Sequence, residues 1–231
     1  MQNPNVSVDC VVFGFDKEKL NLLLIEQKLA DKRKVQYALP GDLILEEEGL
    51  DQAASRVLKE ISGLSGIYLK QFEAFGDPHR VKDIKDLEFL QSYRENPQAR
   101  VITIGYLALV KMEDFAPEAS SFAEKVFWQD IEELPSLAFD HDHIVECALE
   151  KLRHDFIREK TGFELLPERF TLGQVQRLYE TILGKKLDKR NFRKKILKEE
   201  LVTATNQKQK GVLHKPARLY ELSDLKNGHN P

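Results

Sequence analysis

One apolar segment limits most strongly what this chain can fold into. Residues 101–110 read VITIGYLALV and carry no charge. The run is too short to cross a bilayer, which takes about 20 residues. A run of this length and composition is typical of a strand buried on both faces of a sheet. Because 42% of the 231 residues are apolar, the chain can supply the covering layers that such a strand needs.

The first two thirds of the chain read as strands with two main helices. Residues 6–15 alternate in polarity and are rich in β-branched side chains, and residues 20–27 read as their hairpin partner. Apolar residues at three- and four-residue spacing predict a helix over 50–61. Further strands are predicted at 68–75, 101–110 and 125–129, and a second helix at 140–158. Residues 77–98 read as a polar connection with room for a short helical turn. We therefore predict an α+β body, layered α/β/α, over residues 1–157.

Composition also narrows the setting of the protein. Cys10 and Cys147 are the only cysteines, too few for a disulfide framework or a cysteine-ligated zinc site, and we expect both to be inert thiols. No apolar run is long enough to span a membrane, and the N-terminus lacks the basic and apolar stretches of a secretory signal. We expect a cytoplasmic protein without a membrane partner.

The net charge of −3 hides two parts of opposite sign. Residues 1–150 hold 28 Asp and Glu against 16 Lys and Arg, a net of −12. Residues 151–231 hold 19 Lys and Arg against 10 Asp and Glu, a net of +9. A basic module on an acidic body indicates a polyanionic partner. The alternative is a solvated lysine-rich face with no partner, and charge alone does not choose between them.

The C-terminal segment, residues 158–231, has the order of a winged helix–turn–helix. Thr171 and Gln174 have the form of a capping box at the start of a helix that Gly184 ends. Asp188 is a plausible N-cap for a second helix that runs to about residue 199. Strand-like residues 201–205 and 217–222 flank a polar tip. Helix, turn, basic helix and hairpin make up a winged helix–turn–helix.

The second of these helices gathers cations on its outward face, and its first turn is basic. Because cations near a helix N-terminus oppose the helix dipole, local stability does not explain them. We predict that Arg190 and Asn191 read base edges in double-stranded DNA. The predicted backbone contacts, from the helix and then from the wing, are Lys189, Arg193, Lys194, Lys195, Lys208, Lys210, Lys215 and Arg218. The alternative is a protein-interaction module.

The segment LPGDLILEEEGLDQAASRVLKEISGL resembles the Nudix signature. Aligned without gaps, Glu48, Arg56 and Gly63 fit the signature, while Asp42 takes the place of its first glycine. Flanking residues 39–41 and 139–141 also match the family, so chance similarity is the weaker interpretation. The resemblance covers residues 5–150 and implies the Nudix-like α/β/α sandwich.

The carboxylates that hold a metal in Nudix enzymes are mostly missing. They fall at i, i+3 and i+4 of one helix, where this chain has Val57, Glu60 and Ile61. Valine and isoleucine cannot ligate the hard cation that such an enzyme uses. We therefore predict no catalytic residue, no metal and no cofactor. A Nudix hydrolase acting on ADP-ribose or a related nucleoside diphosphate, with metal ligands from elsewhere, is the alternative.

A Nudix-like body followed by a winged helix–turn–helix resembles the Nudix-related transcriptional regulators. Residues 191–195 look like their recognition helix, and residues 215–222 look like the end of their wing. The resemblance implies a homodimer that binds a palindromic operator and is released by an effector, which in the family is ADP-ribose or a sugar. The whole pattern looks most like the arabinose-responsive regulators of Bacteroides-type gut bacteria, which implies control of sugar use.

In the Nudix fold the pocket lies between the box loop, the sheet face and the flanking loops, so we place the effector site there. We predict that its lining includes Gln27, Lys28, Tyr37, Asp42, Asp77, Arg80 and Tyr106, although each of these is alternatively an ordinary surface or core residue. Few cations lie near this region, which favours a sugar over a diphosphate. Asp140, His141, Asp142 and His143 are conceivable metal ligands, but a helix start capped by Asp140 is the better interpretation.

Overall fold

The computed structural model describes residues 5–27, 35–81, 84–94, 96–159, 162–211 and 215–223. The chain forms two compact units. The first holds Met1–Asp16 and Leu20–Leu152, and the second holds Lys17–Lys19 and Arg153–Pro231. The helix α3 (His141–Glu159) contributes to both. The predicted boundary between residues 157 and 158 stays a prediction.

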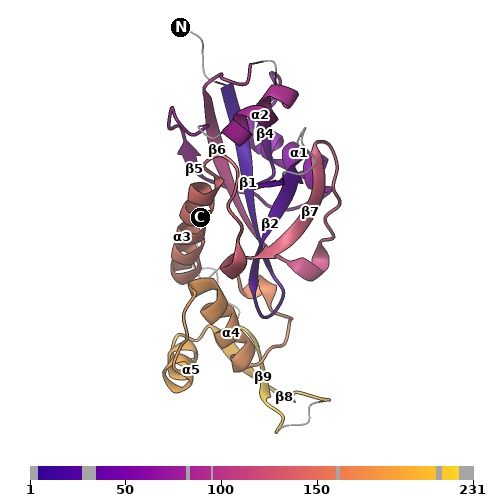
Figure 1. The fold of residues 1–231 in the computed structure, drawn as a ribbon. Helices are drawn as coiled ribbons and strands as arrows, with labels where there is room; N and C mark the ends of the chain where they lie inside the picture. Colours follow the sequence, from indigo (N-terminus) through magenta and orange to yellow (C-terminus); the bar gives the residue numbers. More distant parts are fainter. Residues whose placement is uncertain are drawn as a thin grey trace. The chain divides into compact units, whose positions relative to one another are not determined.

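The first unit is built on a mixed seven-stranded sheet (Figure 1). Its central pair is parallel and runs in register from Asn5↔Val101 to Phe15↔Lys111. The path of strands is β3-β2-β1-β6-β5, while β4 pairs with β1 and β7 pairs with β2. The strands are β1 (Asn5–Phe15), β2 (Leu20–Gln27), β3 (Gln36–Ala38), β4 (Gly41–Leu43), β5 (Lys70–Phe75), β6 (Val101–Lys111) and β7 (Ala123–Asp130).

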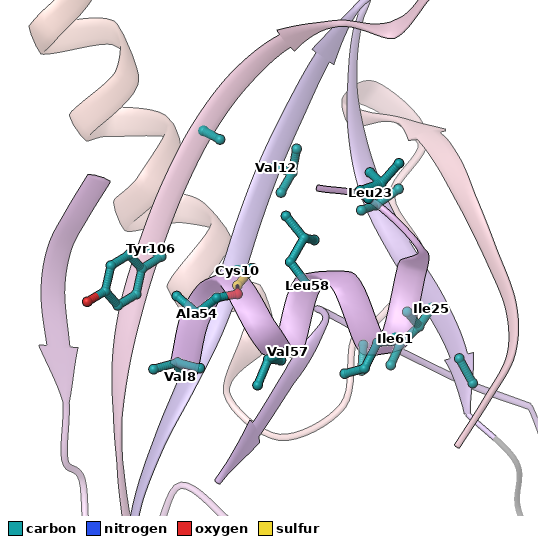
Figure 2. Packing of buried hydrophobic residues seen from close by; sticks show 14 of the residues in the cluster. Val8, Cys10, Val12, Leu23, Ile25, Ala54, Val57, Leu58, Ile61 and Tyr106 are labelled. Atoms are coloured by element: carbon teal, nitrogen blue, oxygen red, sulfur yellow. Dashed lines mark hydrogen bonds between the residues drawn. The ribbon is translucent and has the colours of Figure 1, made fainter. Parts of the chain in front are cut away.

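The helix α1 (Leu50–Ser62) covers one face of this sheet. Figure 2 shows Val57, Leu58 and Ile61 of α1 packed among Val8 and Leu23 from the strands. These side chains are at most 2% exposed. A fully buried aliphatic side chain contributes about 1.5–3 kcal/mol, so this layer supplies a large part of the stability of the body.

The other face of the sheet carries the alternate side chains of β1, starting with the residue after Val8. Val8 faces α1, so the alternation of a strand turns Asp9 to the other side. His141, the first residue of α3, lies beside the Asp9 carboxylate there, with Nε2 and Oδ1 3.5 Å apart. Buried Ile144 and Ala148 continue the inner face of α3. The sheet therefore has a helical layer on each side, and the predicted α/β/α sandwich is confirmed.

Two predicted segments differ in detail. The helical turn allowed for in the polar connection at 77–98 is longer than expected: it is the 10-residue helix α2 (Ile84–Tyr93), whose buried Phe89 and Leu90 make it part of the fold. The strand predicted from residue 68 starts only at Lys70, and Tyr68 is 83% exposed. Among the described residues there are also three short 3-10 turns: η1 (Met112–Asp114), η2 (Ile131–Glu133) and η3 (Phe163–Leu165).

The second unit contains α4 (Leu172–Leu183), α5 (Lys189–Lys198) and a two-stranded ribbon of β8 (Val202–Lys208) and β9 (Arg218–Leu222) (Figure 1). The predicted capping box is present: Gln174 N–H donates to Thr171 Oγ1 at 3.2 Å, and Thr171 N–H donates to Gln174 Oε1 at 2.8 Å. Gly184 ends α4 in the left-handed region at φ 63°. Asp188 caps α5 by accepting from the Asn191 amide at 2.8 Å.

Among the described residues, no helix is both long and apolar enough to cross a membrane.

Candidate functional site

The Nudix-like box is organised around Arg56 of α1. Its guanidinium donates to the Glu48 carboxylate at 2.5 and 2.8 Å and to Glu60 at 2.9 Å. A fourth hydrogen bond from Arg56 reaches the Leu43 carbonyl at 3.0 Å. The hydrogen bond from Arg56 holds the pKa of Glu48 below its ordinary value, and the same bond raises the pKa of Arg56. One arginine therefore binds both remaining box carboxylates, and through Glu48 and the Leu43 carbonyl it fixes the loop before α1.

The other two metal-ligand positions lie inside the protein. Val57 is fully buried and Ile61 is 2% exposed, and both belong to the core under the sheet. Their side chains are hydrocarbon and their neighbours in this core are apolar, so neither position offers an oxygen ligand to a divalent cation. The residues at the box do not fit the metal that Nudix enzymes hold there.

A small hollow of about 50 Å³ opens on the sheet face opposite α1. It lies between β1, β4, α2 and the start of α3. Its lining mixes carboxylates, guanidinium groups, an amide and an imidazole with apolar side chains: Ser7, Asp9, Gln27, Leu39, Gly41, Asp42, Arg80, Val81, Phe89, Leu90, Arg94, Val101, Phe122, Phe139 and His141.

A buried ion network forms the floor of this hollow. Arg80 donates to both oxygens of Asp140, at 2.6 and 3.0 Å, and approaches Asp9 at 3.5 Å. Burial by itself would lower the pKa of Arg80, but the hydrogen bonds to Asp140 and the charge of Asp9 raise it above its ordinary value. The side chain of Arg80 is 7% exposed, so this cation depends on its two carboxylate partners.

His141 completes the network as a neutral imidazole. Its Nδ1 accepts a hydrogen bond from the Leu39 amide at 3.0 Å, which leaves the proton on Nε2, beside Asp9. Burial lowers the pKa of His141 more than the neighbouring carboxylates raise it. Gly41 admits this arrangement, because a Cβ at that position would collide with Asp9 Oδ1.

Three of the predicted effector residues, Gln27, Asp42 and Arg80, line the hollow together. Asp42 lies in β4 with strand backbone, so the loss of the signature glycine leaves no strained residue there. Gln27 is 5% exposed, and among the described residues its Oε1 has no hydrogen-bond partner. A buried acceptor of this kind is costly unless a ligand or water completes it.

The other predicted effector residues lie elsewhere. Tyr106 is fully buried and donates to Asp51 at 2.6 Å, and burial raises its pKa. Tyr37 lines a separate surface depression with Lys125 and Phe127. Asp77 accepts from the His79 amide at 2.7 Å and does not line the hollow. Lys28 lies outside the described residues. Tyr37, Asp77 and Tyr106 thus do not line this hollow, and their part in effector binding stays a prediction.

Sequence reasoning missed Asp9, Arg94 and His141 as lining residues. Asp9 was hidden in an apolar strand, where one carboxylate among buried neighbours was the available signal. His141 starts α3, as a helix-start interpretation of that segment expects, while the Asp140 carboxylate binds Arg80. Among the described residues, no group of three or more His, Cys, Asp or Glu side chains is placed to hold a metal.

The second unit presents a separate surface, formed by α5. Phe192 and Ile196 are buried, and Phe192 stacks edge-on against Tyr179 of α4 with ring centroids 5.2 Å apart. Every other residue of α5 is exposed, including all the predicted DNA contacts on this helix. Within the described chain, no acidic side chain pairs with Lys189, Arg190, Arg193 or Lys194, whereas Lys195 lies 3.8 Å from Glu199. The predicted division between a core face and a cationic face is present.

The predicted wing residues are exposed as well. Lys208 ends β8, Lys210 follows it, Lys215 precedes β9 and Arg218 begins it. Sequence and structure thus place ten polar or cationic side chains of the prediction on the surface of one small unit. Their part in nucleic-acid binding stays a prediction.

Comparison with known proteins supports both parts of this architecture. Residues 3–146 match the NUDIX domain model, which covers more than half of the chain. The chain belongs to the NUDIX family. Residues 162–222 match the NrtR DNA-binding winged helix domain.

Two kinds of relatives share the whole arrangement or part of it. The "ADPR responsive transcriptional repressor NtrR" of Acinetobacter baylyi is 28% identical over 225 residues, 96% of this chain and 83% of that protein. The crystal structure of Shewanella oneidensis NrtR with a 27mer DNA superposes with a TM-score of 0.62 at 26% identity, covering 94% of this chain and 93% of that one. The NUDIX domain of the same protein, crystallised with ADP ribose, gives a TM-score of 0.53 at 25% identity over 66% of this chain and 90% of that one.

Proposed function

We propose that this protein is a transcription regulator that binds operator DNA through α5 and the wing and responds to a small effector held in the hollow of its NUDIX unit. The observation that carries the proposal is the cationic face of α5. A helix whose exposed residues are mostly Lys and Arg gains no stability from that pattern, so the charges are best explained by a polyanion.

The relatives support the same conclusion. The Acinetobacter protein is named as a transcriptional repressor, and the Shewanella protein was crystallised with DNA. By analogy, Arg190 and Asn191 would read bases and the other predicted cations would hold phosphates. A homodimer would place two copies of α5 about 34–36 Å apart, or a multiple of that, so the operator would be an inverted repeat.

ADP-ribose is the first candidate for the effector. It is the ligand in the name of the Acinetobacter repressor and in the Shewanella NUDIX structure. The hollow also holds more cationic groups than the sequence indicated, because Arg94 lines it beside Arg80. The argument that few cations favour a sugar is thereby weakened, and the comparisons give no support to arabinose.

A sugar such as L-arabinose remains the second candidate, on one observation. The acceptors in the lining, Asp9, Gln27 and Asp42, suit the hydroxyl groups of a polyol. ADP-ribose carries such hydroxyl groups on its riboses as well as its diphosphate. ADP-ribose therefore also requires cations for its diphosphate, whereas a sugar requires only the acceptors. Measuring the effect of both ligands on the protein distinguishes the two candidates.

Hydrolysis is the weaker assignment for the NUDIX unit. Val57 and Ile61 are core residues, and Glu48 and Glu60 are both bound by Arg56. We therefore derive no catalytic step for this chain. Incubation with ADP-ribose and Mg²⁺ tests this assignment, and turnover at an ordinary enzyme rate, about 1–10³ s⁻¹, would contradict it.

The full chain and fluorescent DNA test the proposed function. An operator is selected from a random duplex library, and its dissociation constant is then measured with and without ADP-ribose, AMP, L-arabinose and D-ribose. We expect salt-dependent binding that ADP-ribose weakens, because an effector shifts DNA binding only when it prefers one of two states. Release by L-arabinose alone would select the second candidate, and the absence of salt-dependent binding to any duplex would reject the regulator.

A variant of the hollow serves as the control. Gln27→Leu removes the buried acceptor without adding charge, so it should reduce the thermal stabilisation by the effector and leave DNA affinity unchanged in its absence. Equal effector stabilisation in the variant and the parent protein would place the effector elsewhere.

A further inference from the structure

A groove in the second unit brings α4, α5 and the wing together. It encloses about 1150 Å³ of space, part of it open to solvent. Three arginines line it, one from each element: Arg177 of α4, Arg193 of α5 and Arg218 of β9. The rest of its described lining is Thr171, Leu172, Gly173, Gln174, Gln209, Ala217 and Tyr220. None of these residues is acidic, so the groove concentrates positive charge.

Arg177 has a partner that an anion can replace. It donates to Glu18 at 3.1 Å, and Thr181 Oγ1 holds the same residue by donating to its carbonyl at 3.0 Å. The two side chains of the ion pair are 54% and 74% exposed. Because an exposed ion pair contributes only about 0–1 kcal/mol, exchange of Glu18 for a phosphate costs little.

Gly173 gives a second and independent indication. It lies in the first turn of α4, where glycine is less favourable than alanine. A Cβ at this position would meet only Thr171 Oγ1, at 3.6 Å, which is ordinary contact, and its φ is not positive. The protein itself therefore does not require glycine here. Close approach of a ligand to the backbone of the first turn would explain the glycine, because the Cβ of a helical residue tilts toward the N-terminal end of the helix.

We propose that this groove holds one phosphate of the DNA backbone, gripped by Arg177, Arg193 and Arg218, and that Glu18 competes with the DNA for Arg177. The inference rests on the proposed function and adds α4 to the DNA-contacting elements. The amides of the first turn of a helix have no intrahelical acceptors, so they reinforce the attraction for an anion. A phosphate contact fixes register and affinity but reads no sequence.

The test compares single variants of the full chain on the selected duplex and on a scrambled duplex, over a series of salt concentrations. Arg177→Gln and Arg218→Gln should each weaken binding about tenfold on both duplexes. Each should also reduce the slope of log K against log salt by about 0.9. Arg158→Gln, an exposed arginine of α3 outside the groove, is the matched control and should bind as the parent protein does.

Two further variants separate a ligand role from a structural one. Glu18→Gln should raise DNA affinity by about two- to fivefold if the carboxylate competes for Arg177, whereas a merely structural ion pair would give equal or lower affinity. Gly173→Ala should leave the melting temperature equal or higher but weaken binding, and unchanged binding contradicts close approach of a phosphate.

The result that overturns the inference is parent-like affinity and salt slope in both arginine variants while the parent protein binds DNA. Failure of the parent protein to bind any duplex would instead reject the proposed function.

Discussion

Arg80 and Arg193 show how differently the two units use the same side chain. Arg80 is held in the hollow by Asp140 and Asp9, and its side chain is 7% exposed. Arg193 lies on the exposed face of α5, and no acidic partner is present among the described residues. A buried charge must be matched by the chain itself, whereas an exposed charge remains available to a partner. The comparison separates charges that stabilise the fold from charges that remain available to a binding partner.

The largest expected effect is the loss of stability on replacing the buried arginine, Arg80. Arg80→Met leaves Asp9 and Asp140 with an uncompensated buried charge, which typically costs about 3–5 kcal/mol. Urea unfolding followed by circular dichroism measures the loss in the free energy of unfolding. Arg193→Met is the matched control and should stay within about 0.5 kcal/mol of the parent protein. Equal losses in the two variants would remove the distinction between the units.

A smaller effect is expected on DNA specificity. The double variant Arg190→Ala, Asn191→Ala removes both predicted base contacts, each of which provides about 1–3 kcal/mol of discrimination. Its affinity for the selected operator should approach its affinity for a scrambled duplex. Fluorescence anisotropy on both duplexes gives the ratio. If affinity falls equally on the two, these residues hold phosphates and the base contacts lie elsewhere.

The third prediction concerns acid and the hollow. Burial lowers the pKa of His141 in the folded protein, so this residue binds a proton more readily in the unfolded chain. Stability from this group is complete above the ordinary histidine pKa of about 6.5 and is lost as the pH falls below it, by at most about 1.4 kcal/mol per pH unit. Asp9, Arg80, Asp140 and Asp86 are the charged groups that face it. Unfolding curves between pH 7.5 and 5.5 should show this decline.

His141→Gln provides the comparison for that decline. A glutamine oxygen can accept from the Leu39 amide but does not titrate. The variant should therefore lose less stability over the same pH range. A decline as steep as that of the parent protein would assign the acid sensitivity to another group.

The smallest effect tests a single exposed cation. Lys194→Gln should reduce the salt slope of DNA binding by about 0.9 and weaken the affinity a few-fold, with the preference for the operator unchanged. A series of anisotropy titrations between 50 and 200 mM salt gives the slope. An unchanged slope would show that Lys194 faces away from the duplex, although its exposure predicts the contact.

Local patterns carried most of what the sequence could predict. Thr171, Gly184 and Asp188 mark helix ends through bonds that span a few residues, and each of these predictions is confirmed. The core face of α5 followed from spacing alone. The Val57 and Ile61 substitutions could be read from the signature, but their burial under the sheet depended on packing that the structure shows.

The hollow depended on contacts between distant segments. Asp9 meets Arg80 and His141, which lie 71 and 132 positions further along the chain, so no local pattern links them. Tyr106 shows the same limit, because the sequence does not indicate that its hydroxyl donates to Asp51, 55 positions earlier in the chain. Polar residues in apolar strands are therefore better candidates for such a network than polar residues in loops.

The parallel pairing of β1 with β6 has a consequence for the folding of this protein during translation. Residues 5–15 must wait for residues 101–111 before the middle of the sheet can close, so an early strand stays without its neighbour for almost half of translation. The basic segment emerges after that. A chain that stalls just after residue 152 contains every residue of the first unit but lacks α4, α5 and the wing.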